Sequence, residues 1–231
     1  MGKEPRPSIP RDLFIIDEAV RSEYSFIEPA DSCFYVWEYM SHLWESGKPR
    51  PDYTQYPANN LISNLQIPVS SQPNRIYWKD KAVQYAARAI STLLPEYWRK
   101  ANATFVPVPP SKLESDPEYD PRLLDILRAV RPKLPDIKSL VTLNSEGFDA
   151  KQKGVRPADR AQHYCINDDG PGSEPEVLVL FDDILTTGCH FKAMEMVLRE
   201  RFPDTIILGL FLARTVRPPQ DYDNIFAQLL A

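Results

Sequence analysis

Two adjacent carboxylates stand where a wholly apolar stretch of the chain ends. Residues 177–181, VLVLF, are followed by Asp182 and Asp183, two apolar residues, and the turn Thr186, Thr187, Gly188, Cys189 and His190. Hydroxyl groups, a glycine and the free N–H groups at a helix start bind phosphate, because the donors and the helix dipole both face the anion. Carboxylates would repel a phosphate, but they accept hydrogen bonds from the hydroxyls of a sugar that carries one. The stretch therefore predicts a ribose 5-phosphate site, although Asp and Thr also commonly end strands and cap helices.

The sequence around this stretch alternates between strand and helix patterns, which is typical of an α/β fold. The apolar run at 177–181 has the composition of a strand buried on both faces of a parallel sheet. Further strands are expected at residues 104–109, 140–143, 163–167 and 205–213. Helices are expected at residues 78–95, 120–134 and 188–202, the second with Asp120 as N-cap and Pro121 at its first position. We expect an open, mostly parallel twisted sheet with flanking helices, in which ligands bind beyond the carboxyl ends of the strands.

The chain divides by composition into three parts: an N-terminal extension and cap at residues 1–75, the α/β core at 76–216, and a tail at 217–231. The predicted cap is rich in aromatic residues. Their side chains either stack on a bound base, as a hood outside the sheet, or form the core of a small subdomain. They are Tyr35, Trp37, Tyr39, Trp44, Tyr53 and Tyr56.

Composition limits the class of protein. The 231 residues are 43% hydrophobic and 26% charged, as in ordinary soluble domains. No apolar run approaches the roughly 18 residues of a membrane span, and the first residues lack the apolar core of a signal peptide. Cys33, Cys165 and Cys189 are far apart without metal-type spacing, which fits a reducing compartment. We expect a cytoplasmic protein, and the net charge of −5 argues against nucleic-acid binding driven by phosphate neutralisation.

The stretch from Val177 to His190 resembles the phosphoribosyl pyrophosphate signature of type I phosphoribosyltransferases. That signature is four apolar residues, two acids, two apolar residues, a hydroxyl or acid, Thr, Gly, any residue, and Thr or Ser. Every position matches except the last, where His190 stands. The order of elements over residues 104–214 is similar as well, and VPVP at residues 106–109 most resembles the competence protein F group.

The resemblance implies an enzyme that binds phosphoribosyl pyrophosphate with Mg²⁺ and transfers the ribose 5-phosphate to a nitrogen acceptor, releasing pyrophosphate. The implied catalytic residues are Asp182, Asp183 and Lys112, and Mg²⁺ is expected to bind mainly through the substrate, with the two aspartates as further ligands. The 5-phosphate would lie on Thr186, Thr187, Gly188, Cys189 and His190. The diphosphate would lie on Pro110, Ser111, Lys112 and Arg214. Alternatively, Lys112 is a solvated lysine and Arg214 forms a salt bridge.

The resemblance also assigns a mobile loop to residues 144–161. This segment carries Lys151, Gln152, Lys153, Arg156 and Arg160, and it is either a lid that excludes water or an exposed charged loop. Related enzymes have an acid at the position of Thr186 that assists proton transfer, which threonine cannot do. His190 either donates a hydrogen bond to the phosphate or is a partly buried helix residue without a ligand role.

Three functions follow from this pattern. The first is a phosphoribosyltransferase whose acceptor the sequence does not name. The second is a non-catalytic module that senses phosphoribosyl pyrophosphate or a nucleotide and signals to a partner. The third, by similarity to the competence protein F group, is a protein that acts with DNA, which the acidic charge balance disfavours. The aromatic residues are also compatible with a homodimer or a protein partner.

Overall fold

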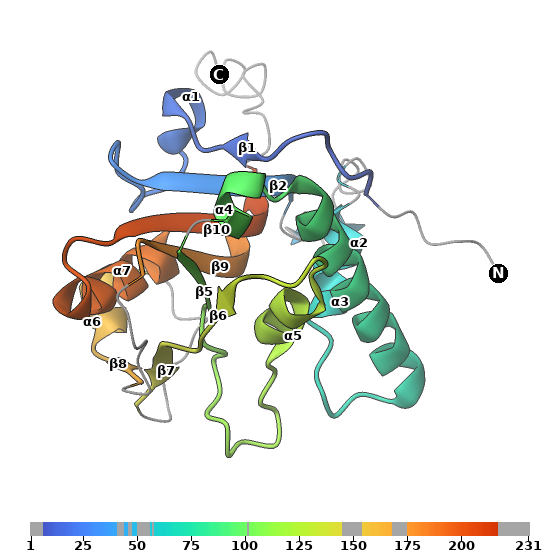
Figure 1. Ribbon diagram of the computed structural model, residues 1–231. Coiled ribbons are helices and arrows are strands. Elements are labelled where there is room, and N and C mark those ends of the chain that lie inside the picture. Colours follow the sequence, from blue (N-terminus) through green and yellow to red (C-terminus); the bar gives the residue numbers. More distant parts are fainter. Residues whose placement is uncertain are drawn as a thin grey trace, which may run out of the picture.

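The computed structural model describes residues 7–40, 44–45, 48–49, 56, 58–100, 102–144, 154–167 and 175–216. Six strands form the main sheet in the order β1-β2-β10-β9-β5-β6 (Figure 1). β1 is antiparallel to β2, and the remaining neighbours in this sheet are parallel. The strands are β1 (Phe14–Ile15), β2 (Ser32–Tyr39), β5 (Ala103–Pro107), β6 (Asp136–Ile137), β9 (Val177–Leu185) and β10 (Ile206–Thr215).

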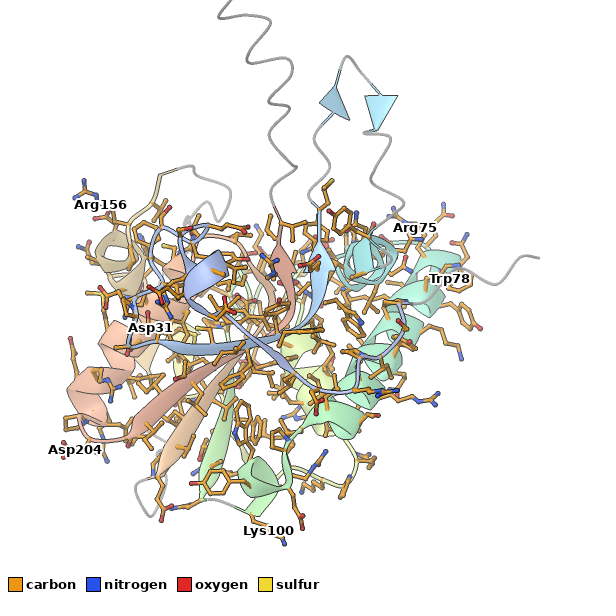
Figure 2. The ribbon with its side chains drawn as sticks, turned by 90° about the horizontal axis from the view of Figure 1, so that it is seen from above. Asp31, Arg75, Trp78, Lys100, Arg156 and Asp204 are labelled. Carbon is orange, nitrogen blue, oxygen red and sulfur yellow. The ribbon has the colours of Figure 1, made fainter. Side chains whose placement is uncertain are left out.

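Helices cover the sheet on both faces, which confirms the expected α/β class. Figure 1 shows α6 and α7 on one side of the sheet and α2, α3 and α5 on the other, and Figure 2 shows the same separation from above. The helices are α1 (Glu18–Arg21), α2 (Ala58–Leu65), α3 (Pro73–Leu93), α4 (Glu96–Lys100), α5 (Arg122–Ala129), α6 (Pro157–Ala161) and α7 (Cys189–Arg201). Among the described helices, none combines the length and the apolar composition needed to cross a membrane.

The core lies between the sheet and these two helical layers. The five apolar residues that open β9 are all buried, as their composition predicts for a central parallel strand. On one face Phe191 of α7 packs edge-on against Phe211 of β10, with ring centroids 6.5 Å apart. On the other face α5 buries Leu123, Ile126 and Leu127. Each large apolar side chain buried in this way contributes about 1.5–3 kcal/mol, so the sheet and both layers form one stable support for the loops above it.

The sheet reverses its strand order between β5 and β9. The chain leaves β9 through α7 and returns as β10 on one side, whereas it leaves β5 through α5 and returns as β6 on the other side. Parallel crossovers have one hand, so the two helices lie on opposite faces of the sheet. Their loops therefore diverge at the carboxyl ends of β5 and β9, which is where such sheets bind ligands.

The N-terminal region differs from the expected cap. Residues 14–39, within the region expected as a cap, contain two strands of the main sheet, with β2 paired in parallel register to β10. Cys33, Val36 and the other buried residues of β2 pack into the same core as β9, because a strand beside β10 covers its otherwise open edge. Trp44 belongs to a small hairpin of β3 (Trp44–Glu45) and β4 (Lys48–Pro49), and Tyr53 lies outside the described residues.

Three further expectations need correction. β7 (Val141–Leu143) and β8 (Tyr164–Ile166) pair antiparallel with each other as a separate small sheet, since both are short and only partly buried. α5 begins one residue later than predicted: Pro121 is its N-cap, while Asp120 is engaged by the side chains of Lys79 and Arg122. β9 does not end at residue 181 but continues through both aspartates to Leu185.

Candidate functional site

A cavity of about 310 Å³ lies at the carboxyl ends of β5 and β9. Its walls come from the loop after β5, the end of β9, the turn into α7, and the start of α5. The structure brings together most of the residues that the sequence assigns to a ligand site. Those that line the cavity are Pro110, Ser111, Asp182, Asp183, Thr186, Gly188, Cys189 and His190.

The cavity exists because β5 is shorter than its neighbour. Pro107 pairs with Phe181, and the N–H of Val108 donates the last bond to the Phe181 carbonyl, at 2.9 Å. Pro109 and Pro110 follow and have no N–H to continue the ladder. β9 runs four residues further, paired only with β10 on its other side. The proline-rich loop thus leaves the acid pair at an open edge.

Asp183 is the more strongly held of the two acids. Its Oδ2 accepts hydrogen bonds from Arg122 Nη2 at 2.8 Å, from Arg122 Nε at 3.2 Å, and from Gln66 Nε2 at 3.3 Å. Burial alone would raise the pKa of Asp183, but the charge and hydrogen bonds of Arg122 and the bond from Gln66 bring it below its ordinary value. Asp183 is therefore an anion at neutral pH.

Asp182 has different surroundings. Both carboxylates line the cavity, but the described hydrogen bonds of Arg122 and Gln66 reach Asp183 and not Asp182. Its Oδ1 accepts the N–H of Asp183 at 2.8 Å, and its Oδ2 lies 3.7 Å from Nδ1 of His190, beyond hydrogen-bond distance. Burial, and then the negative charge of Asp183, raise the pKa of Asp182 well above its ordinary value. Asp182 accordingly takes up a proton more readily than Asp183 does.

A buried lysine organises the donors that reach Asp183. The ammonium of Lys79 donates to the carbonyls of Leu65 and Ile67 at 2.8 and 2.7 Å, and to Asp120 at 2.7 Å. An ammonium has three N–H donors, so all of them are used. Gln66 lies between the two carbonyls, and Asp120 accepts a bond from Arg122 at 3.0 Å. Lys79 thereby fixes both segments that face Asp183.

No local sequence pattern predicts these supporting residues. Lys79, Gln66 and Arg122 belong to the α2–α3 region and the start of α5, far along the chain from Asp183. Asp120, expected as a helix cap, accepts the backbone N–H of Arg122 at 3.2 Å and also links the side chains of Lys79 and Arg122.

His190 begins the first turn of α7 and faces Asp182. Burial, and then the positive charge of Arg160, lower the pKa of His190 to about 4 against the opposing effect of Asp183, so the imidazole is neutral at pH 7. Its Nδ1 is buried and has no hydrogen-bond partner among the described residues, while 37% of the side chain is exposed. The ring therefore lies at the edge of the cavity with a polar atom turned inward.

The turn before α7 is tightly constrained. Gly188 has φ +83°, and a Cβ at this position would lie 2.5 Å from Cδ1 of Ile27. The Thr187 carbonyl accepts the N–H of Phe26 at 3.0 Å, and its hydroxyl accepts the N–H of Cys189 at 3.3 Å. Thr187 does not line the cavity, unlike the prediction for a phosphate ligand; it holds the turn in place.

The two cations assigned to a diphosphate lie elsewhere. Lys112 is exposed, pairs with Asp116 at 3.3 Å, and lines a second cavity of about 380 Å³ on the β7 side of the same loop. Arg214 is buried on β10, where it pairs with Glu23 at 3.4 Å and with Glu38 of β2. Neither side chain lines the cavity of the acid pair.

The predicted mobile loop is described in part. Arg156 is the N-cap residue of α6, and Arg160 is buried in that helix, which packs against α7. The charge of Arg160 acts on His190, and hydrogen bonding to Arg160 lowers the pKa of Cys189 against the larger effect of burial, which raises it. Lys151, Gln152 and Lys153 lie outside the described residues.

The two aspartates are the candidate metal ligands of the cavity. Within the described parts of the chain, no group of three or more His, Cys, Asp or Glu side chains is arranged to hold a metal ion. Asp182 and Asp183 supply carboxylate oxygens, which Mg²⁺ prefers, and it commonly takes its other ligands from substrate phosphates and water. The donor set thus fits a magnesium ion brought by a phosphorylated ligand.

Neither a scan of protein-family models nor a search of the curated proteins finds a match to this chain. Because a fold of this class serves many chemistries, the function follows from the cavity and its groups.

Proposed function

We propose that the chain binds phosphoribosyl pyrophosphate with Mg²⁺ and transfers its ribose 5-phosphate to a nitrogen acceptor, with release of pyrophosphate. The observation that carries this proposal is the shared cavity of the acid pair and the N-terminus of α7 at the switch point of the sheet. The resemblance of residues 177–190 to the phosphoribosyltransferase signature supports the same assignment.

The phosphate end of the ligand would lie at the start of α7. Gly188, Cys189 and His190 line the cavity there, and the positive end of the helix dipole faces it. The hydroxyl of Thr186 lines the same wall. The side chains of Asp182 and Asp183 stand beside this wall and accept hydrogen bonds from sugar hydroxyls, so one ribose 5-phosphate satisfies both groups.

The transfer breaks one bond at C1 of the ribose and forms another. The C1–O electron pair leaves with pyrophosphate, C1 passes through an oxocarbenium-like state, and a nitrogen lone pair forms the new bond. The anionic Asp183 stabilises the positive charge that develops on the sugar. Mg²⁺, when bound, neutralises charge on the leaving diphosphate. Asp182, with its raised pKa, is suited to take the proton that the acceptor nitrogen loses.

Two observations favour a second candidate, a sensor that binds the ligand without turnover. Thr186 stands where related enzymes have an acid, and Asp183 is held by Arg122 and Gln66 as a structural anion. Such an arrangement is sufficient for binding and does not require chemistry.

Binding and turnover separate the two candidates. Isothermal titration with phosphoribosyl pyrophosphate and with ribose 5-phosphate, each with and without Mg²⁺, measures binding. Pyrophosphate release with a panel of purine, pyrimidine and amine acceptors measures turnover. We expect Asp183→Asn to weaken binding at least about tenfold, as loss of charge-assisted hydrogen bonds does. Asp204→Asn is the matched control, because Asp204 is exposed and precedes the amino end of β10, at the opposite edge of the sheet from the cavity.

Release of pyrophosphate with any acceptor supports the transferase. Magnesium-dependent binding without release from any acceptor supports the sensor. If the wild-type protein binds neither ligand, both candidates are wrong.

A further inference from the structure

Arg122 is the one permanently cationic side chain among the described residues that line the cavity. A diphosphate leaving group carries several negative charges, and sites for it use fixed cations in addition to a metal ion. Lys112 and Arg214, the cations expected from the sequence, form ion pairs outside this cavity. Among the described residues that line the cavity, Arg122 is therefore the candidate for the charge that a diphosphate requires.

The guanidinium of Arg122 retains donors for a ligand. It has five N–H groups in a planar fork. The described contacts use three of them: Nε and Nη2 each donate to Asp183, and Nη1 donates to Asp120. One N–H on each terminal nitrogen remains, and 23% of the side chain is exposed. These N–H groups can donate charge-assisted hydrogen bonds to phosphate oxygens.

The position of Arg122 is fixed before any ligand arrives. Asp120 holds one end of its guanidinium and is itself held by the buried Lys79 at 2.7 Å. Asp183 holds the other end. A cation that is already oriented loses little conformational freedom on binding, so its contacts contribute more to affinity.

We propose that Arg122 forms an anion subsite on the α5 side of the acid pair and binds the diphosphate of the ligand, opposite the phosphate wall at the start of α7. The assignment rests on the proposed function, and adds the residue that recognises the leaving group. Asp182 and Asp183 lie between the two anion subsites, where the ribose is expected. The same contact orients the diphosphate for departure, because the planar guanidinium, held by Asp120 and Asp183, donates from a fixed position.

The test compares two ligands that differ only in the diphosphate. The dissociation constants of phosphoribosyl pyrophosphate and of ribose 5-phosphate, both with Mg²⁺, are measured for the wild type, Arg122→Gln, Arg122→Lys and Arg128→Gln. Arg128 is the matched control, since it is exposed on the same helix. Circular dichroism and unfolding by urea report whether each variant is folded. Arg122→Lys keeps the positive charge beside Asp183 and is the variant to use if Arg122→Gln does not fold.

We expect Arg122→Gln to weaken phosphoribosyl pyrophosphate binding by about 10- to 100-fold, and Arg122→Lys by about fivefold or more, because lysine lacks the fork. Ribose 5-phosphate affinity should change by less than about threefold in both variants, as should both affinities in Arg128→Gln. An equal loss for the two ligands in folded variants would show that Arg122 acts only through Asp183, and would overturn the inference. Unchanged binding of both ligands would overturn it as well. Failure of the wild type to bind either ligand would instead refute the proposed function.

Discussion

Replacing Lys79 with methionine removes the charge that connects α3 to both segments facing Asp183. The residue is only 7% exposed, and its ammonium makes three short hydrogen bonds. Breaking a buried ion pair by removing one partner costs about 3–5 kcal/mol. Asp120 keeps Arg122 as an ionic partner, so we expect the stability lost with Lys79 to lie near the lower end of this range. The carbonyls of Leu65 and Ile67 also lose a charged donor, partly offset because the lysine is no longer desolvated.

The expected net effect is a loss of about 3 kcal/mol in the free energy of unfolding. For a chain of this size that corresponds to a fall in Tm of about 6–12 °C. Urea denaturation followed by tryptophan fluorescence and circular dichroism measures the free energy. Lys81→Met is the matched control two residues further along α3, since Lys81 is exposed and its ammonium lies 5.3 Å above the Tyr77 ring. Its loss should stay within about 0.5–1 kcal/mol.

A double-mutant cycle isolates the Lys79–Asp120 contact. Combined with Asp120→Asn, Lys79→Met should cost about 1–2 kcal/mol less than the sum of the single substitutions, because the two groups interact directly. If Lys79→Met were no more destabilising than Lys81→Met, or if the cycle were additive, Lys79 would not organise the site as described.

Three other substitutions test the surroundings of the cavity. Gly188→Ala should destabilise the protein in urea unfolding by at least 1 kcal/mol more than the control Gly154→Ala. Both glycines have positive φ, but only at Gly188 would an added Cβ collide with Ile27. Equal effects of the two substitutions would contradict the packing of the turn. Between pH 6.5 and 4.5 the unfolded protein protonates His190 and the folded protein does not, because the folded-state pKa of about 4 lies below the ordinary value. The wild type therefore loses unfolding free energy as the pH falls through this window, and His190→Gln should reduce that loss. An unchanged pH profile would refute this. Arg214→Met should lower Tm, because it removes the ion pairs with Glu23 and Glu38, and should leave ligand affinity within about twofold in titration calorimetry. A tenfold loss of affinity would show that Arg214 contacts the ligand.

The elements around the cavity could be predicted because their signals are local. A continuous apolar run identified β9, helical spacing identified α7, and the turn between them carried its own glycine and hydroxyls. These signals also placed the acid pair at the correct end of the sheet. The position of β2 beside β10 had no such signal, since it depends on pairing between segments separated by most of the chain.

The charged network required contacts that no local pattern encodes. Gln66 and Asp183 are 117 positions apart, and Lys79 and Asp120 are 41 apart. Arg214 was assigned to the diphosphate from its place at the end of the last strand. That place gives the position of its backbone but not the partner of its side chain. In the parallel register Arg214 lies directly opposite Glu38, an opposite-charge pair across neighbouring strands. That pairing becomes visible only once β2 is known to border β10.

Asp182 and Asp183 are the same type of residue, but their charges have opposite effects on the stability of the folded protein. Asp183 has a lowered pKa and ionic partners, so Asp183→Asn should cost about 2–3 kcal/mol at pH 7. Asp182 has a raised pKa, so its negative charge is unfavourable in the folded protein above pH 4, and Asp182→Asn should be neutral or stabilising by about 1 kcal/mol at pH 7. Both substitutions should weaken ligand binding, because ligand binding requires both carboxylates even though one of them lowers the stability of the protein. Urea unfolding at pH 7 and at pH 4.5 measures the difference. If Asp182→Asn lost as much stability as Asp183→Asn, the two carboxylates would share one environment and the asymmetry would be wrong.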